Sequence, residues 1–98
     1  MYPANAYVIR QATSSDGSVL ERLAALDGQK PLSGRALIGE IDGTPAAAIS
    51  LEDGRVVADP FKLTAQLVPV LIMRRRSLQA FYKRPSLTAR LKAGLASA

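Results

Sequence analysis

The sequence contains neither cysteine nor histidine. The chain therefore cannot form a disulfide, supply a thiolate nucleophile, build a Cys/His zinc site or assemble a Ser-His-Asp triad. Several enzyme classes are excluded in this way, and we expect no metal site. The first residues lack a basic segment followed by an apolar core, so no signal peptide is expected. Together these absences favour a cytoplasmic location, with a position at the periphery of a membrane complex as the alternative.

Acidic residues are absent after Asp59. Up to that position eight acidic residues stand against five basic ones, whereas the remainder carries eight basic residues and no carboxylate. The chain is therefore electrically polarised, and its C-terminal region is basic. The basic residues that we expect to contact an anion or a partner are Arg74, Arg75, Arg76, Lys83, Arg84, Arg90 and Lys92.

Three kinds of anion fit this basic region, and a simple solvated helix end is the alternative to all of them. Nucleic acid would be held through its phosphates. Anionic lipid is plausible because an apolar stretch, residues 63–73, directly precedes the cluster. An acidic protein surface needs no further sequence feature. Three successive arginines on a helix cannot all face one way, so we expect one of them to reach back toward the carboxylates of the sheet.

The first third of the chain predicts a strand followed by a helix. Residues 7–12 alternate as a short strand does. Thr13 and Asp16 have the spacing of a capping box, and apolar residues then recur at helical spacing as far as Leu26. Gly28 is expected to end this helix, and a loop should follow it.

Two Asp-Gly pairs provide the clearest local signal. They separate three apolar segments, residues 36–41, 46–51 and 55–58, which predicts an antiparallel meander. Gly39 is expected to mark a bulge. The small side chains of residues 46–48 indicate that another element packs closely on the middle strand.

The last third predicts a long helix. Its apolar residues broaden the hydrophobic surface almost all the way round for two turns, so we expect cover on more than one side. Pro69 should kink the helix. A second, weaker helix is expected over residues 86–96, which divides the chain into a domain, 1–84, and a basic helix or tail, 85–98. The leucine and phenylalanine residues expected on one helix face are Leu63, Leu67, Leu71, Leu78 and Phe81.

These elements predict an α+β fold, with a short antiparallel sheet of about four strands, an N-terminal helix and a long C-terminal helix. Their order resembles the N-terminal half of the Gcn5-related N-acetyltransferase (GNAT) fold. The segment VIRQATSSDGSVLERLAAL is similar to the first strand and helix of that family, and IGEIDGTPAAAISL resembles its second and third strands. The resemblance extends to about Arg76.

The family resemblance implies a glycine-rich turn after the fourth strand, which would hold the pyrophosphate of acetyl-CoA at a helix N-terminus. Here the corresponding segment begins with Asp59, and Pro60 and Phe61 stand in place of glycine. Proline removes a donor, and the carboxylate adds negative charge. The fifth strand and the helix that complete the acyl-binding cleft have no counterpart. We therefore expect no enzyme activity and no cofactor.

A residual acetyltransferase, completed by dimerisation, remains an alternative. Its general base would be Asp59 or Glu40, and its acid would be Tyr2, Tyr7 or Tyr82. No spacing in the sequence singles out a pair among them.

The favoured function is a non-catalytic interaction or accessory subunit that binds a protein partner or a second copy of itself. Without a fifth strand, residues 55–58 should form an exposed sheet edge. The helix that follows is more apolar than one face of a small sheet requires. The alternative is that residues 86–96 fold back over this surface. The expected interface residues are Val56, Val57, Val68, Val70, Ile72 and Met73.

Overall fold

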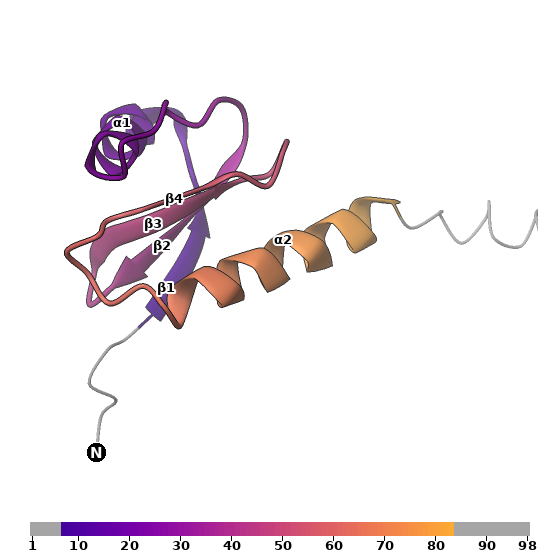
Figure 1. Ribbon diagram of the computed structural model, residues 1–98. Helices are drawn as coiled ribbons and strands as arrows, with labels where there is room; N and C mark the ends of the chain where they lie inside the picture. The colour runs from indigo at the N-terminus through magenta and orange to yellow at the C-terminus, as the bar shows by residue number, and fades with distance from the viewer. Residues whose placement is uncertain (1–6, 84–98) are drawn as a thin grey trace, which may run out of the picture.

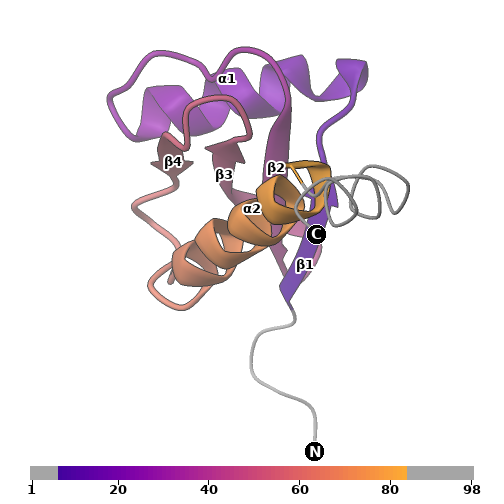
Figure 2. The same cartoon turned by 90° about the vertical axis from the view of Figure 1, so that its right-hand side faces the viewer.

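The computed structural model describes residues 7–83, and it confirms the α+β class (Figure 1). Within these residues, four antiparallel strands form one sheet in the order β1-β2-β3-β4. The two α-helices of this segment lie on opposite faces of the sheet (Figures 1 and 2). The elements are β1 (Tyr7–Gln11), the short 3-10 helix η1 (Ser14–Asp16), α1 (Gly17–Leu26), β2 (Ala36–Ile41), β3 (Thr44–Ser50), β4 (Val56–Ala58) and α2 (Leu67–Lys83).

The meander expected from the two Asp-Gly pairs is confirmed. Asp42 and Gly43 join β2 to β3 with φ angles of 51° and 83°. Positive φ at both central residues is what a tight hairpin turn of type I′ requires. Gly54, at φ 78°, turns the chain from β3 into β4. Each strand consequently pairs with its neighbour in sequence.

Small residues in the middle strands allow both helices to approach the sheet closely. The register of β2 against β3 shifts between Gly39 and Glu40, which confirms the expected bulge. A Cβ atom on Gly39 would lie 2.8 Å from a methyl carbon of Leu67 in α2. Ala48 belongs to the core beneath α1, and Ala47 to the core beneath α2.

The first helix begins and ends as the sequence predicts. The Thr13 N–H donates to the Asp16 carboxylate at 2.8 Å, as in a capping box, although a turn of 3-10 helix precedes α1. Gly28, at φ 64°, terminates the helix. The Gln29 N–H then reaches the Ala24 carbonyl at 2.9 Å, which satisfies one of the last helical acceptors.

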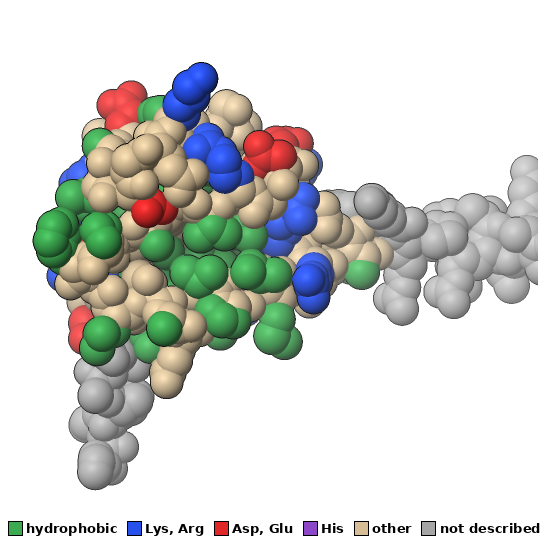
Figure 3. Space-filling model, viewed as in Figure 1, with side chains coloured by type: hydrophobic (Ala, Val, Ile, Leu, Met, Phe, Trp, Pro, Cys, Tyr) green, Lys and Arg blue, Asp and Glu red, His purple; other side chains and the backbone are tan. Residues whose placement is uncertain are grey.

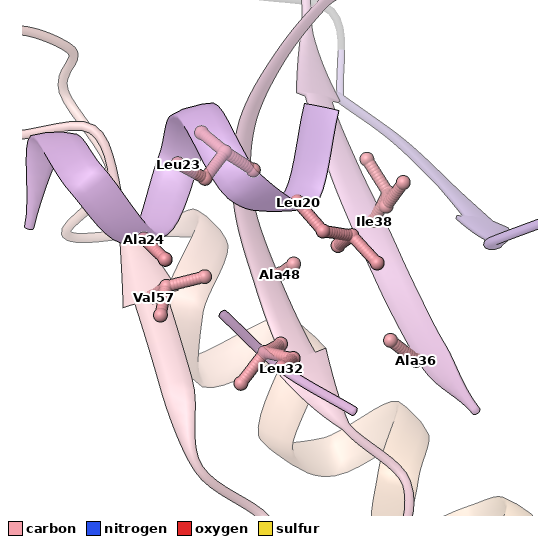
Figure 4. Packing of buried hydrophobic residues seen from close by; sticks show 8 residues of the cluster. All are labelled: Leu20, Leu23, Ala24, Leu32, Ala36, Ile38, Ala48 and Val57. Atoms are coloured by element: carbon pink, nitrogen blue, oxygen red, sulfur yellow. The ribbon is translucent and has the colours of Figure 1, made fainter. Parts of the chain in front are cut away.

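The core on the α1 face combines one side of α1 with alternating residues of the sheet (Figure 4). Leu23 and Ala24 of α1 are fully buried against this face. Leu32, which belongs to the loop between α1 and β2, also packs here and is only 7% exposed. Its place in the core was not predicted, because the segment after Gly28 has the residues of a simple connecting loop. The buried members are Leu20, Leu23, Ala24, Leu32, Ala36, Ile38, Ala48 and Val57.

The core on the other face is built around Leu67 and Leu71, which lie one turn apart on α2 and are fully buried. Pro69 is only the third residue of α2. In the first turn a proline removes no N–H that the helix needs, so the predicted kink has no cause there. The described part of the chain covers α2 on one side only, contrary to the expectation of cover on several sides.

Two of the residues expected on the buried face of the last helix lie elsewhere. Leu63 precedes α2, in the loop of residues 59–66, and is 79% exposed. Phe81 belongs to α2 but is 67% exposed. The sequence periodicity placed the start of the helix about one turn too early. The weaker helix predicted for residues 86–96 lies outside the described residues.

Candidate functional site

The six residues expected at one interface do not lie on one surface, and one of them is buried in the core. Val57 is fully buried in the core beneath α1, so the prediction that it contacts a partner is wrong. Its neighbour Val56 points to the other face, as alternation along a strand requires. Val56 is half-buried there, against the core beneath α2.

The four interface candidates on α2 also separate. Val68 and Ile72 lie one turn apart and are half-buried at the margin of the core. Val70 and Met73 are 40% and 65% exposed. At 100° per residue, Val70 lies about 160° around the helix from Ile72. These side chains therefore cannot serve one flat partner surface together.

An apolar strip remains at the surface between β4 and α2, and Figure 3 shows hydrophobic side chains there. Its members pack against the core beneath α2, but each of them is only partly buried. They come from the edge strand, from the turn before it and from the first two turns of the helix. We call these residues the β4–α2 strip: Leu51, Val56, Ala58, Val68 and Ile72.

The arginine triplet behaves as expected, because one of its members reaches back to the sheet. Arg75 is half-buried, and its Nη1 atom would lie 2.9 Å from a Cβ atom on Gly54. Its charge contributes to lowering the pKa of Asp53, after the larger effects of hydrogen bonds from the Arg55 N–H and from Ser50. The Nε atom of Arg75 is buried without a hydrogen-bond acceptor among residues 7–83.

The other members of the triplet, Arg74 and Arg76, are exposed. Arg76 follows Ile72 by four residues and so lies on the same side of α2 as the β4–α2 strip. Arg74 follows Val70 by four residues and lies on the other side. Lys83 is the last residue of α2. The remaining predicted contacts, Arg84, Arg90 and Lys92, lie outside the described residues.

The outer edge of β4 is closed by side chains, which corrects the expectation of an exposed edge. Gln29 donates from Nε2 to the Val56 carbonyl at 3.0 Å, and the Ala58 N–H donates to Asp27 Oδ2 at 3.1 Å. Gln29 also donates to Asp27 Oδ2 at 2.7 Å. The two side chains thus make two of the hydrogen bonds that a neighbouring strand would make.

Arg55 fixes this arrangement. Its guanidinium donates to the Lys30 carbonyl at 2.7 Å and to the Pro31 carbonyl at 2.9 Å, so the loop after α1 is held against β4. We call Asp27, Gln29 and Arg55 the edge latch. Sequence reasoning missed the latch because Asp27 and Gln29 lie more than 25 residues from Arg55 and from the β4 groups that they bond, so no local motif contains it. Polar residues directly after the helix-ending Gly28 were the only available signal.

The loop between β4 and α2 uses its own backbone donors. Asp59 is 4% exposed, and its Oδ1 atom accepts the Phe61 N–H at 2.8 Å. The Asp59 carbonyl accepts the Lys62 N–H at 3.2 Å, and the Thr64 carbonyl accepts the first two N–H groups of α2, at 3.0 and 2.9 Å. Few donors therefore remain to hold a phosphate group at this turn.

The candidate acid–base residues do not come together. Glu40 lies on the α1 face, where its carboxylate accepts a hydrogen bond from Arg10 Nε at 3.0 Å. Tyr7 lies on the α2 face, and its hydroxyl donates to Gln66 Oε1 at 3.3 Å. Asp59 is engaged with its own loop. Tyr2 lies outside the described residues, and Tyr82 belongs to α2.

A shallow depression of about 220 Å³ lies beside Tyr7, lined also by Leu63, Ala65 and Gln66. It is smaller than the usual small-molecule site, and the phenol is the one ionisable group among the described residues that line it. Within residues 7–83, no group of three or more potential metal ligands gathers. No helix in this part of the chain has the length and apolar character needed to cross a membrane.

The strongest electrostatic cluster joins β1, η1 and β2. Arg10 donates to both Asp16 oxygens, at 2.7 and 2.9 Å, and to Glu40. This bidentate bond, followed by that from the Thr13 N–H, holds the pKa of Asp16 well below its usual range. The same two carboxylates raise the pKa of Arg10. All charges in the cluster are paired, so its role is to hold η1 against the sheet.

Comparison with known proteins gives no match: no family model, no curated protein and no solved structure is similar to this chain.

Proposed function

We propose that this domain is a non-catalytic interaction or accessory subunit that binds a protein partner through the β4–α2 strip. The observation that carries the proposal is the apolar surface left between an edge strand and a helix. Exposed apolar patches with a polar rim are typical of protein contact sites. Because Asp27 and Gln29 bond the edge of β4, we no longer expect the partner to add a strand there. We expect the partner to contact the side chains of the strip.

Charge supports a partner with an acidic rim. Arg76 lies beside the strip and is exposed. The Arg75 guanidinium is half-buried at the β3–β4 turn, so it is less available to a partner. Rim charges chiefly accelerate association and confer specificity, whereas apolar contacts at the centre supply affinity. We therefore assign affinity to Val56, Val68 and Ile72, and electrostatic steering to Arg76.

The loop after β4 supports the absence of catalysis. An acetyltransferase needs several free backbone N–H groups here for the pyrophosphate of acetyl-CoA. Pro60 offers none, and the Phe61 N–H is bonded to Asp59, whose carboxylate would also repel the ligand. Calorimetric titration with millimolar acetyl-CoA is therefore expected to give no binding heat. A measurable heat would return the dimer-completed acyltransferase to consideration.

Capture of a tagged chain from native cells, at low salt and with nuclease present, tests the proposal. We expect one protein to co-purify in fixed stoichiometry with the wild-type chain. Ile72→Gln places an amide in the strip and should abolish the association, whereas Val70→Gln changes a side chain on the other side of α2 and should preserve it. Thermal unfolding of both variants checks that each is folded.

The exposed arginines supply a second matched pair. Arg76→Ser should weaken association and reduce its salt dependence, whereas Arg74→Ser should have little effect. Recovery of the chain alone would contradict the proposal, as would equal retention of the partner by both glutamine variants. Association that disappears with nuclease would favour nucleic acid. Co-sedimentation with anionic vesicles, lost at high salt, would favour a membrane surface.

A further inference from the structure

The two edges of the sheet differ in how their outward backbone groups are satisfied. On β4 the edge latch bonds the outward N–H of Ala58 and the outward carbonyl of Val56. At the opposite edge, β1 pairs only with β2 within residues 7–83. A strand with one unpaired side can template the addition of another strand. Because β4 is protected, β1 is the edge at which another strand could be added.

The register shows which groups of β1 face outward. The Ala12 N–H donates to the Ala36 carbonyl at 2.9 Å, so residues 8, 10 and 12 direct their backbone groups toward β2. Because hydrogen-bonded and non-hydrogen-bonded pairs alternate in an antiparallel ladder, Tyr7, Ile9 and Gln11 direct theirs away. No hydrogen bond to these outward N–H and carbonyl groups is made by any residue of the described part of the chain.

Within residues 7–83, the surroundings of β1 leave room for another strand. The α1 helix crosses β3 and β4, and α2 crosses β2 and β3, so neither is centred over β1. Figure 2 shows β1 at the margin of the sheet, away from β4. The strand contains no proline or lysine, residues that commonly discourage edge pairing, and its one charged residue, Arg10, is paired with Asp16 and Glu40. Val8 is 48% exposed although it is an apolar strand residue.

We propose that β1 pairs with β1 of a second copy of this chain, antiparallel about a twofold axis at Ile9. Ile9 then pairs with Ile9 of the partner subunit, and Tyr7 pairs with Gln11 of the partner subunit. The outward groups are symmetric about Ile9, so the three residues of each copy form about six hydrogen bonds across the axis. The two sheets become one.

Side-chain chemistry favours a second copy over an unrelated strand. Pairing about Ile9 places Val8 opposite Arg10 of the partner subunit, whose aliphatic part can cover it. The Arg10 guanidinium is already neutralised by Asp16 and Glu40 of its own chain. The twofold axis therefore brings no uncompensated like charges together. On the other face, half-buried Tyr7 and Ile9 gain apolar neighbours.

This interface is independent of the proposed function. The β4–α2 strip lies at the opposite edge of the sheet, so a dimer through β1 leaves it accessible. Loss of the dimer and loss of the partner are therefore separate outcomes, measured with different variants.

Gln11→Pro in the full chain tests the pairing. Gln11 is exposed, and its N–H faces away from β2, so proline removes an outward donor without breaking the existing ladder. Gln11→Thr is the matched control because it keeps the N–H. Sedimentation equilibrium should show a dimer for the wild-type chain and for Gln11→Thr. The dissociation constant of Gln11→Pro should rise by about tenfold or more, since symmetry removes two hydrogen bonds.

Hydrogen exchange of the wild-type chain provides a test that needs no variant. The Ile9 amide should be protected at high protein concentration and should lose that protection on dilution. The Arg10 amide, which faces β2, should stay protected at both. A wild-type chain that remains monomeric at about 1 mM would overturn the proposal. So would a dimer in which the Ile9 amide exchanges freely, or one that folded Gln11→Pro forms equally well.

Discussion

Each face of the sheet carries one helix, yet the two faces are covered to different extents. On the α1 face, the helix is assisted by Leu32 from the following loop and by the Arg10 cluster, which holds η1 against β1 and β2. On the α2 face, among the described residues, the helix alone covers the sheet. Among residues 7–83, two partly buried hydrophobic residues flank the first core, whereas eight flank the second.

The difference shows that a single helix does not cover four strands. One helix is about 10 Å wide, and four strands are about 15 Å across, so apolar residues beside it stay at the surface unless loops cover them. The β4–α2 strip exists for this reason. Its exposure follows from geometry, and the proposed partner would supply the cover that loops provide on the other face.

The largest expected effect contrasts the closed core beneath α1 with the β4–α2 strip on the other face. Leu23→Ala, beneath α1, should lower the free energy of unfolding by about 3 kcal/mol, because it leaves a cavity in a closed core. Ile72→Ala, in the β4–α2 strip, should cost about 1 kcal/mol because the side chain is already half in water. Urea denaturation of both variants measures the difference. Equal losses would mean that the α2 face is as well covered as the other.

A somewhat smaller effect concerns the contact between α2 and the sheet. Gly39→Ala would place a Cβ atom 2.8 to 3.0 Å from three side-chain carbons of the buried Leu67, which should cost about 1–3 kcal/mol. Gly17→Ala, on α1, meets no atom within 4 Å and should be neutral or slightly stabilising. Thermal unfolding distinguishes the two substitutions. A neutral Gly39→Ala would show that α2 moves freely on its face.

The smallest of the three effects concerns acid and the α1 face. The folded state lowers the pKa of Asp16 below its unfolded value near 3.9, so the carboxylate contributes stability above that value. That contribution is lost as pH falls from about 5 toward the folded pKa. Asp16→Asn should therefore lose less stability than wild type between about pH 5 and pH 2. Glu21→Gln, at an exposed position of α1, is the control, and its stability should change with pH as that of wild type does. Identical dependence of stability on pH in all three chains would contradict a stabilising role for the Asp16 carboxylate.

The order of the elements could be predicted from local signals, since Asp-Gly pairs, a capping box and Gly28 each determine the backbone over a few residues. The placement of interface residues could not. The separation of Val56 from Val57 required the strand to be assigned to a covered sheet face, and the separation of Val70 from Ile72 required the helix rotation. The edge latch depends on contacts between residues more than 25 positions apart, which no local pattern contains.

The close contact between Gly39 and Leu67 also restricts how the sequence can vary at these two positions. The absent methyl group at position 39 sets how near α2 can lie to the sheet, and the leucine at position 67 occupies the space so created. Each residue is suitable only while the other is present. In relatives of this chain, a larger residue at position 39 should therefore be accompanied by a smaller one at position 67, and the two positions should change as a pair.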